Sequence, residues 1–137
     1  MKISNSFPPN YDLIKLVLKP NPEAIFCYGD TIYNPSKREL TDDVLLHEEI
    51  HSRQQNQVGS PEIWYTRYLQ DKHFRLTQEI EAYGEQYHFA KKYVKNYILN
   101  AWLLENLAKA LSSEDYGKMI SYGSAVSKIR NHKKVNA

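Results

Sequence analysis

Residues 47–51 read His47-Glu48-Glu49-Ile50-His51, an HExxH motif near the middle of a chain of 137 residues. Histidines four residues apart on a helix lie on one face, about one turn apart, which is the separation at which two imidazoles can bind one Zn²⁺. A glutamate directly after the first histidine can take a proton from a water bound to that metal. The motif therefore predicts a helix that carries His47 and His51 as zinc ligands and Glu48 as a general base.

The residues before the motif predict a small sheet. Residues 24–28 and 31–33 are rich in branched and aromatic side chains, and Gly29-Asp30 between them is typical of a two-residue hairpin turn. Residues 11–18 fit a short capped helix that ends at Pro20, although their branched side chains also allow a strand.

Helices are expected to dominate the rest of the chain. Thr41 or Asp42 should cap the motif helix, which is expected to run to about Gln57. Further helices are expected at about 60–68, 74–95 and 97–111, with a weaker helical stretch near 126–129. The sequence thus predicts an α+β fold, mostly helical, with a small β-hairpin or sheet preceding the HExxH helix. We expect one domain over residues 1–130 and a polar, basic tail over 131–137.

A catalytic zinc site needs a third protein ligand, and helical phase selects Glu79. The apolar stripe of the helix at 74–95 is formed by Leu76, Ile80, Tyr83, Tyr87, Ala90 and Val94. At about 100° per residue, Glu79 lies roughly 60° from the centre of this stripe and Glu81 lies roughly 140° from it. A carboxylate on the buried side is costly unless it is paired, protonated or bound to a metal. A metal would account for Glu79, and so would an ion pair with Arg67 or Arg75.

The combination of HExxH with a glutamate on a later helix resembles the zincin metallopeptidases of the glutamate-ligand class. The string Glu79-Ile80-Glu81-Ala82 is similar to the Glu-x-Glu-Ala pattern of small, uncharacterised bacterial and phage-associated minimal zincins. The resemblance covers roughly residues 25–90. It implies a zincin-like minimal domain in which the first glutamate of the string, Glu79, is the third zinc ligand.

The chain departs from this pattern at Tyr83. Many glutamate zincins carry an aspartate or asparagine four residues after the ligand glutamate, where an aspartate orients a ligand histidine through its other ring nitrogen. A tyrosine can accept that hydrogen bond but carries no charge. Besides Glu48, Tyr83 is our candidate catalytic residue, as an oxyanion stabiliser, and Tyr65, Tyr87 and Arg67 are further candidates by position and chemistry alone. The resemblance also suggests that an extended peptide pairs with an open edge of the hairpin.

Composition restricts the setting of this chemistry. The formal net charge of +2 is too small to indicate a nucleic-acid partner, and no apolar run predicts a signal peptide or a membrane span, so we expect neither partner. Cys27 is the single cysteine, which makes a disulfide framework impossible and fits a reducing, cytoplasmic setting. The prediction is therefore a Zn²⁺-dependent hydrolase, a peptidase acting on a peptide or protein substrate in the cytoplasm of a bacterium or its phage.

Three alternatives remain open on the sequence alone. His47 and His51 could be ordinary polar or core histidines. Glu48-x-x-His51 and Glu85-x-x-His88 share the Glu-x-x-His spacing of ferritin-like di-iron bundles, although that fold needs a long helix where this chain is rich in prolines and strand-like. The zincin fold could also serve as a non-catalytic, metal-stabilised binding or phage assembly module. Glu48 favours catalysis, because a structural zinc site needs no base.

Outside the site, the large aromatic residues are expected in the core and two histidines at the surface. The expected core residues are Trp64, Trp102, Phe74 and Phe89, and the expected surface histidines are His73 and His132. The basic side chains near the end are expected to be solvated; they are Lys128, Arg130, Lys133 and Lys134.

Overall fold

The two stretches before the motif form the predicted hairpin, and the first residues of the chain add a third strand. In the computed structural model, which describes residues 1–133, β2 (Phe26–Tyr28) and β3 (Thr31–Tyr33) are antiparallel, and β1 (Lys2–Ser4) runs parallel to β3. Gly29 has a φ of 65°, the left-handed conformation that this turn requires. The strand order is β1-β3-β2, so β2 forms one edge of the sheet.

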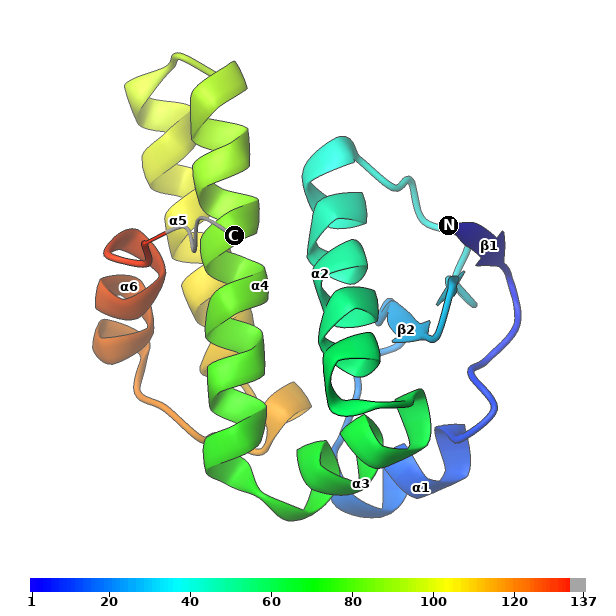
Figure 1. Ribbon diagram of the computed structural model, residues 1–137. Helices are drawn as coiled ribbons and strands as arrows, with labels where there is room; N and C mark the ends of the chain where they lie inside the picture. The colour runs from blue at the N-terminus through cyan, green and yellow to red at the C-terminus, as the bar shows by residue number, and fades with distance from the viewer. Residues whose placement is uncertain (134–137) are drawn as a thin grey trace.

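Helices make up most of the remaining chain, and the structure is 62% helical (Figure 1). In chain order the helices are α1 (Tyr11–Val17), α2 (Asp42–Val58), α3 (Pro61–Gln70), α4 (Lys72–Tyr93), α5 (Tyr97–Leu111) and α6 (Tyr122–Arg130), with a 3-10 turn, η1 (Glu114–Tyr116), between the last two. The predicted α+β class is therefore confirmed, and residues 11–17 are helical. In the part of the chain that the structure describes, no helix is both long and apolar enough to cross a bilayer.

Local sequence sets the ends of the helices that position the motif. Thr41 directly precedes α2, as predicted for the capping position, although its side chain makes no capping hydrogen bond. Helix α2 ends at Val58, and the following Gly59 has a φ of 117°, which favours glycine. Ser60 then caps α3 through its side chain, and Pro61 occupies the first turn, where its fixed φ suits a helix. Asp71 caps α4 in the same way. These closely spaced boundaries reverse the chain direction twice and bring α4 back along α2.

Helices α2 and α4 lie side by side in the centre of the molecule (Figure 1). The β2 strand packs against α2, whereas α5 and α6 pack against α4. One apolar cluster fills the space between α4, α5 and α6; its fully buried members are Ala108, Leu111, Ala125 and Ile129. A second cluster joins α1, α3 and the start of α4; it includes Ile14, Trp64, Tyr68 and Phe74. The polar seam between α2 and α4 lies between these clusters.

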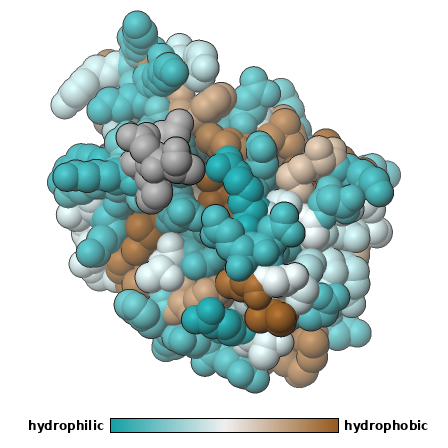
Figure 2. Space-filling model, viewed as in Figure 1, coloured by the Kyte–Doolittle hydropathy of each residue, from teal (hydrophilic) through white to brown (hydrophobic). Residues whose placement is uncertain are grey.

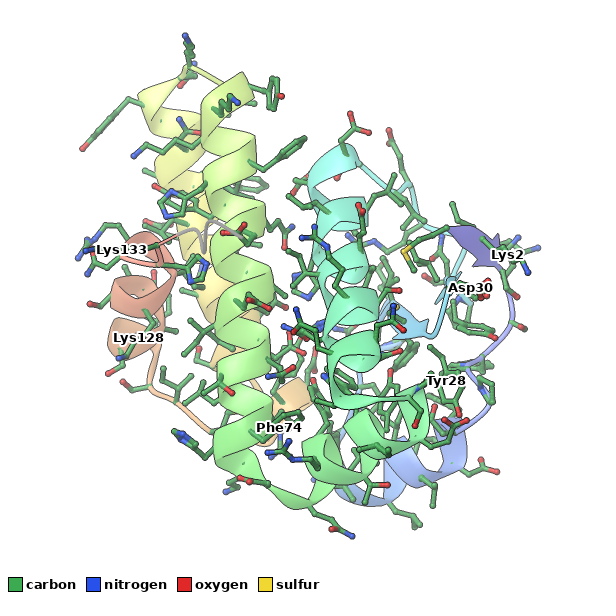
Figure 3. The ribbon with its side chains drawn as sticks, in the orientation of Figure 1. Lys2, Tyr28, Asp30, Phe74, Lys128 and Lys133 are labelled. Carbon is green, nitrogen blue, oxygen red and sulfur yellow. The ribbon has the colours of Figure 1, made fainter. Side chains whose placement is uncertain are left out.

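Two of the four aromatic residues expected in the core are elsewhere. Trp64 and Phe74 are buried, as predicted, and Phe74 lies where α4 begins (Figure 3). Trp102, however, is 62% exposed, and Phe89 is only half-buried. Trp102 lies near the start of α5, which extends with the end of α4 beyond the other helices (Figure 1), so none of residues 1–133 covers it.

The prediction for one of the two histidines is also wrong. His73 is exposed, but His132 is half-buried and its Nε2 lies 3.0 Å from Oε2 of Glu85. The ring packs on Gly84 of α4, where an added Cβ atom would collide with it. The absence of a side chain at Gly84 therefore lets the segment after α6 lie against α4.

The basic side chains after α5 behave as expected where they are described. Lys128, Arg130 and Lys133 are exposed, and the two lysines extend outward from α6 and the segment after it (Figure 3). Lys134 lies outside the described residues. The face of the molecule in Figure 2 is mainly hydrophilic, with apolar residues scattered in small groups.

Candidate metal centre

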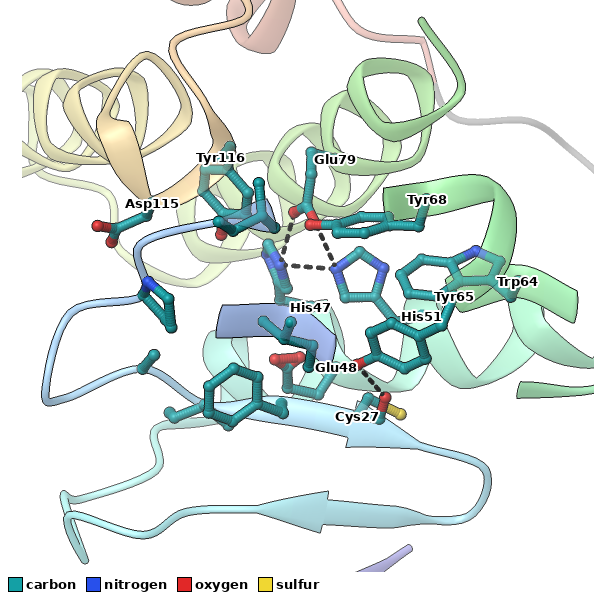
Figure 4. A pocket seen from close by; sticks show the side chains of 16 residues that line it. Cys27, His47, Glu48, His51, Trp64, Tyr65, Tyr68, Glu79, Asp115 and Tyr116 are labelled. Atoms are coloured by element: carbon teal, nitrogen blue, oxygen red, sulfur yellow. Dashed lines mark hydrogen bonds and ion pairs between the residues drawn. The ribbon is translucent and has the colours of Figure 1, made fainter. Parts of the chain in front are cut away.

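The three residues expected to bind a metal meet in the seam between α2 and α4 (Figure 4). His47 and His51 stand on successive turns of α2, and their Nε2 atoms are 3.1 Å apart. The Glu79 carboxylate of α4 lies against both rings, with Oε1 3.3 Å from Nε2 of His47 and Oε2 3.2 Å from Nε2 of His51. The structure thus brings two nitrogens and a carboxylate from two helices to one point.

These side chains are buried, and their polar atoms are not all satisfied by the protein. Glu79 is 2% exposed, and its Oε1 makes an ion-pair contact but no hydrogen bond. The Oε2 atom of Glu48 is also buried without a hydrogen-bond partner. Such orphaned oxygens are costly, and a cation between the imidazoles and the Glu79 carboxylate would remove part of that cost. Two histidines and one glutamate are a donor set that Zn²⁺ takes in catalytic sites, so the residues present fit a zinc ion.

Glu48 is the rival of Glu79 as the third ligand. Ligand atoms of His47, Glu48 and His51 lie within 4.8 Å of one another. The two oxygens of Glu79, however, face the two Nε2 atoms, whereas Glu48 approaches from the side of β2 (Figure 4). This arrangement fits the prediction of Glu79 as the third ligand, with the Glu48 carboxylate left for proton transfer, and the choice between the two glutamates stays a prediction.

The other ring nitrogen of His47 is held by a glutamine. Nδ1 of His47 lies 2.9 Å from Oε1 of Gln86, and Nε2 of Gln86 donates to Oδ2 of Asp43 at 2.9 Å. Because an amide oxygen can only accept, Nδ1 of His47 must carry the proton and the lone pair of Nε2 must face the site. This is the tautomer that a metal requires from His47.

A second glutamine holds the Nδ1 atom of His51. Nδ1 of His51 lies 2.8 Å from Oε1 of Gln54, one turn later on α2. The Nε2 of Gln54 donates to Oε1 of Glu81 at 2.7 Å and to the carbonyl of Gln78 at 3.0 Å. Each histidine is therefore connected through an amide to a carboxylate. Neither glutamine was predicted from the sequence. Gln54 had a local signal, because a residue three positions after His51 lies on the same face of the helix.

The arginines offered as alternative partners of Glu79 bind elsewhere. Arg75 donates to the backbone carbonyls of Tyr68 at 2.7 Å and Tyr116 at 3.1 Å, and the guanidinium of Arg67, on α3, stacks on the Phe74 ring at 4.1 Å. The Glu79 carboxylate instead accepts a hydrogen bond of 2.6 Å from the Tyr68 hydroxyl at Oε2. The ion pair between Glu79 and an arginine is therefore ruled out as the reason for its burial.

The buried charges shift one another's protonation. Burial alone would lower the pKa of His51, but the adjacent Glu79 carboxylate outweighs it and raises that pKa to about 9. Burial opposes ionisation of Glu79, yet the two imidazoles hold its pKa well below the ordinary value. Burial also raises the pKa of Glu48, which makes its carboxylate a stronger base.

A cavity of about 80 Å³ lies beside the three motif residues. Its polar wall contains Glu48, and its apolar wall is formed by Ile14, Leu18, Ile25 and Phe26. Cys27 also lines the cavity (Figure 4), but burial strongly raises the pKa of its thiol, so little thiolate exists to act as a nucleophile. The reactive groups that face this cavity are therefore the histidines and the carboxylates.

Tyr83 lies at the site, but its hydroxyl is bonded away from the ligands. Its ring packs edge-on against His47 at 4.4 Å between centroids, and its hydroxyl is 2.7 Å from that of Tyr116 on η1. Tyr116 lines the cavity and was missed in the sequence analysis. No local sequence pattern indicates a role for Tyr116, because it follows α5 and lies far from the motif helix in the sequence. The assignment of Tyr83 as an oxyanion stabiliser stays a prediction.

The other candidate oxyanion stabilisers are engaged in packing. The Tyr65 hydroxyl donates to the Cys27 carbonyl at 2.8 Å. Tyr87 is buried in the apolar cluster between α4, α5 and α6, and Arg67 is exposed on the ring of Phe74.

The outer edge of β2 is already occupied, so the expected strand addition is not available at Cys27 and Gly29. Gln55 of α2 donates to the Cys27 carbonyl at 2.9 Å and accepts from the Gly29 N–H at 2.7 Å. Ser52 donates to the Gly29 carbonyl at 2.7 Å. These side chains attach the sheet to α2 and close that part of the edge to a peptide.

This geometry gives little support to the two alternative interpretations of the histidines, a di-iron site and ordinary core residues. Glu85, which a di-iron site would need near Glu48, instead contacts His132. His47 and His51 face each other and a buried carboxylate, an arrangement that ordinary core histidines do not need in order to satisfy their hydrogen bonds. Comparison of the chain with protein-family models, curated proteins and solved structures finds no match.

Proposed function

We propose that this protein is a zinc-dependent hydrolase, a peptidase of minimal zincin type that acts in the cytoplasm. The observation that carries the proposal is the convergence of His47, His51 and Glu79, with a separate buried carboxylate, Glu48, beside them. Bound Zn²⁺ would act as a Lewis acid that acidifies a coordinated water and polarises a carbonyl. His47, His51 and Glu79 would hold the metal, and Gln86 and Gln54 would orient the two rings.

Glu48 is suited to move the proton. Its carboxylate is buried, its Oε2 has no hydrogen-bond partner, and burial raises its pKa. A carboxylate in that state can accept a proton from the attacking water and then deliver it to the amine of the leaving group. A purely structural metal site gains nothing from a base at this position, so Glu48 distinguishes catalysis from simple metal binding.

The shape of the cavity supports a preference among peptide substrates. Apolar side chains share the lining of the cavity with Glu48; Ile14, Leu18 and Ile25 are among them. An apolar side chain next to the cleaved bond would bury its surface there, whereas a charged one would lose its hydration without a partner. We therefore expect cleavage beside apolar residues.

The experiment that tests the mechanism compares Glu48→Gln with Glu49→Gln. Both variants lose one carboxylate from α2, but Glu49 is exposed, so it is the matched control. On a peptide library read by mass spectrometry, Glu48→Gln should lower hydrolysis by at least about 100-fold while one zinc per chain is retained. Glu49→Gln should behave as the parent protein, and a Glu48→Gln variant with parental activity would contradict the mechanism.

A non-catalytic, metal-stabilised binding module is the second candidate. Two observations favour it: the β2 edge is closed at Cys27 and Gly29, and the hydroxyl of Tyr83 is bonded to Tyr116. One bound zinc per chain, with no peptide of the library cleaved by the parent protein, would support this candidate over the hydrolase.

A further inference from the structure

Apolar side chains are exposed together at the end of the α4–α5 hairpin. The most exposed are Tyr97 (90%) and Ile98 (77%), in the first turn of α5, followed by Trp102 (62%) one turn later. Tyr93, Val94 and Leu99 complete the group, which we call the hairpin tip. Tyr93 and Val94 line a hollow beside α2 and Tyr97 lines another beside α6, so the exposed apolar residues surround the end of the hairpin. Singly exposed apolar residues are ordinary, but six within ten residues at one end of a hairpin are a feature typical of an interaction site.

The charge of this segment has a single sign. Lys91, Lys92 and Lys95 are exposed at the tip, and no aspartate or glutamate occurs in the sequence between Glu85 and Glu105. The nearest acidic side chains from another element are at the start of α2, where Asp42 and Asp43 line a hollow beside Phe89 and Tyr93. One of them, Asp43, accepts a hydrogen bond from Gln86.

The hairpin tip extends beyond the rest of the molecule. In Figure 1 the end of α4 and the start of α5 extend past α2 and α6, and in Figure 3 the side chains there point outward. From Glu79 to Tyr93 the rise along α4 is about 21 Å, so the tip is remote from the candidate metal centre. The tip can therefore meet a large flat surface without the body of the protein in the way.

We propose that the hairpin tip is a docking surface for a lipid bilayer with anionic headgroups. Tyrosine and tryptophan favour the boundary between headgroups and acyl chains, and Ile98 and Leu99 would enter the apolar side of that boundary. From Tyr97 to Trp102 the rise is about 7.5 Å, within the depth of roughly 5–10 Å that interfacial helices reach. The three lysines lie at the same end of the hairpin, so their long side chains would extend back from it to reach the headgroups.

The lysines favour an anionic surface over a second copy of the chain. In a symmetric pair of tips that meet end to end, two sets of three lysines would be brought together, and the segment between Glu85 and Glu105 has no acidic residue to offset them. A bilayer supplies many negative charges to the same groups. The sequence expectation of no membrane partner rested on the lack of a spanning segment, and surface docking needs none. The docking is independent of the proposed hydrolase activity.

The test uses flotation of the full chain with vesicles of phosphatidylcholine alone or mixed with phosphatidylserine. The parent protein should bind the mixed vesicles far more tightly. Replacing Lys91, Lys92 and Lys95 by glutamine should weaken that binding by about fivefold per lysine, roughly 100-fold in all. The matched control replaces the exposed lysines Lys19, Lys109 and Lys128 by glutamine and should bind as the parent does.

Tryptophan fluorescence gives a second readout. Trp64 is buried and Trp102 is exposed, so a blue shift on addition of vesicles reports the tip. The shift should occur in the parent and vanish in Trp102→Phe, which should still float with vesicles, whereas a Tyr97→Ser, Ile98→Ser, Trp102→Ser variant should no longer float. Circular dichroism melting should show that these surface changes leave the fold intact.

Several outcomes would overturn the proposal. Equal binding to both vesicle types, or equal loss in the lysine variant and its control, would mean that the tip lysines do not recognise the lipid. A blue shift of the tryptophan fluorescence that appears when the protein concentration is raised without vesicles would show that the tip self-associates. If the protein does not float with vesicles and a second protein shields Trp102 from solvent, the hairpin tip binds a protein partner instead of lipid.

Discussion

Glu79 and Glu81 are two residues apart on α4 and differ entirely in their surroundings. Glu79 is 2% exposed and lies between two imidazoles and the Tyr68 hydroxyl. Glu81 is half-buried and accepts a hydrogen bond from the amide of Gln54. The first carboxylate can touch a metal, and the second acts on the metal only through Gln54 and His51.

This difference predicts unequal effects on zinc binding. Glu79→Ala should abolish binding at one zinc per chain, because two histidines alone hold the ion weakly. Glu81→Ala should keep that stoichiometry and weaken affinity by about tenfold, since only the support of His51 is lost. Competition with a chelating dye measures both affinities. Tighter binding by Glu79→Ala than by Glu81→Ala would transfer the ligand role to another carboxylate.

A second prediction at the scale of single residues concerns the glutamines that bond to the Nδ1 atoms of the histidines. Gln86→Ala removes the acceptor for Nδ1 of His47 and leaves Asp43 without its donor. Zinc affinity should fall by about 10–100-fold. Gln57→Ala, an exposed glutamine on α2, is the matched control and should bind zinc as the parent does in the same chelator titration. Equal affinities of the two variants would remove Gln86 from the site.

At the scale of elements, periodicity predicted which face of each helix is buried but not how far its neighbours extend. The stripe on α4 selected Glu79 over Glu81, and the buried residues of α5 are Leu104, Leu107, Ala108 and Leu111. Trp102 was placed in the core wrongly, because the phase of a residue on a helix does not tell whether another element covers that turn. The same limit applies to Gly84. Only a glycine leaves room there for the ring of His132, which lies far away in the sequence, so helical phase could not predict it.

Gly84 therefore yields a prediction for stability. Glycine to alanine inside a helix normally stabilises by about 0.5–1 kcal/mol, and Gly123→Ala on α6 should show this gain, since nothing lies within 4 Å of an added Cβ there. Gly84→Ala should instead lower the free energy of unfolding in urea, because the new methyl group collides with the His132 ring. In a His132→Ala background the sign should reverse. A stabilising Gly84→Ala in the parent chain would contradict the packing.

At the scale of the whole molecule, the candidate site joins segments that the sequence separates widely. The hydrogen bond from Gln86 to Asp43 connects α4 to α2 across the seam, and the hydrogen bond between the hydroxyls of Tyr83 and Tyr116 connects α4 to η1. Local patterns predicted the residues with distinctive chemistry, His47, His51 and Glu79. Only Gln54 had a local signal, its helical phase relative to His51. Gln86 and Tyr116 had none, because these residue types are common and acquire a role only when the tertiary fold places them beside a ligand.

Because the site ties α2 to α4, metal should stabilise the entire fold. At a zinc concentration about 1,000 times the Kd, binding to the native state alone adds about 4 kcal/mol, which for a chain of this size raises Tm by about 10 °C. Scanning calorimetry with and without a chelator measures the shift. Glu79→Ala should melt at one temperature under both conditions, and Glu48→Gln should keep the full shift, because the proposed third ligand is Glu79 and the proposed role of Glu48 is proton transfer. A shift lost in Glu48→Gln and kept in Glu79→Ala would exchange the roles of the two glutamates.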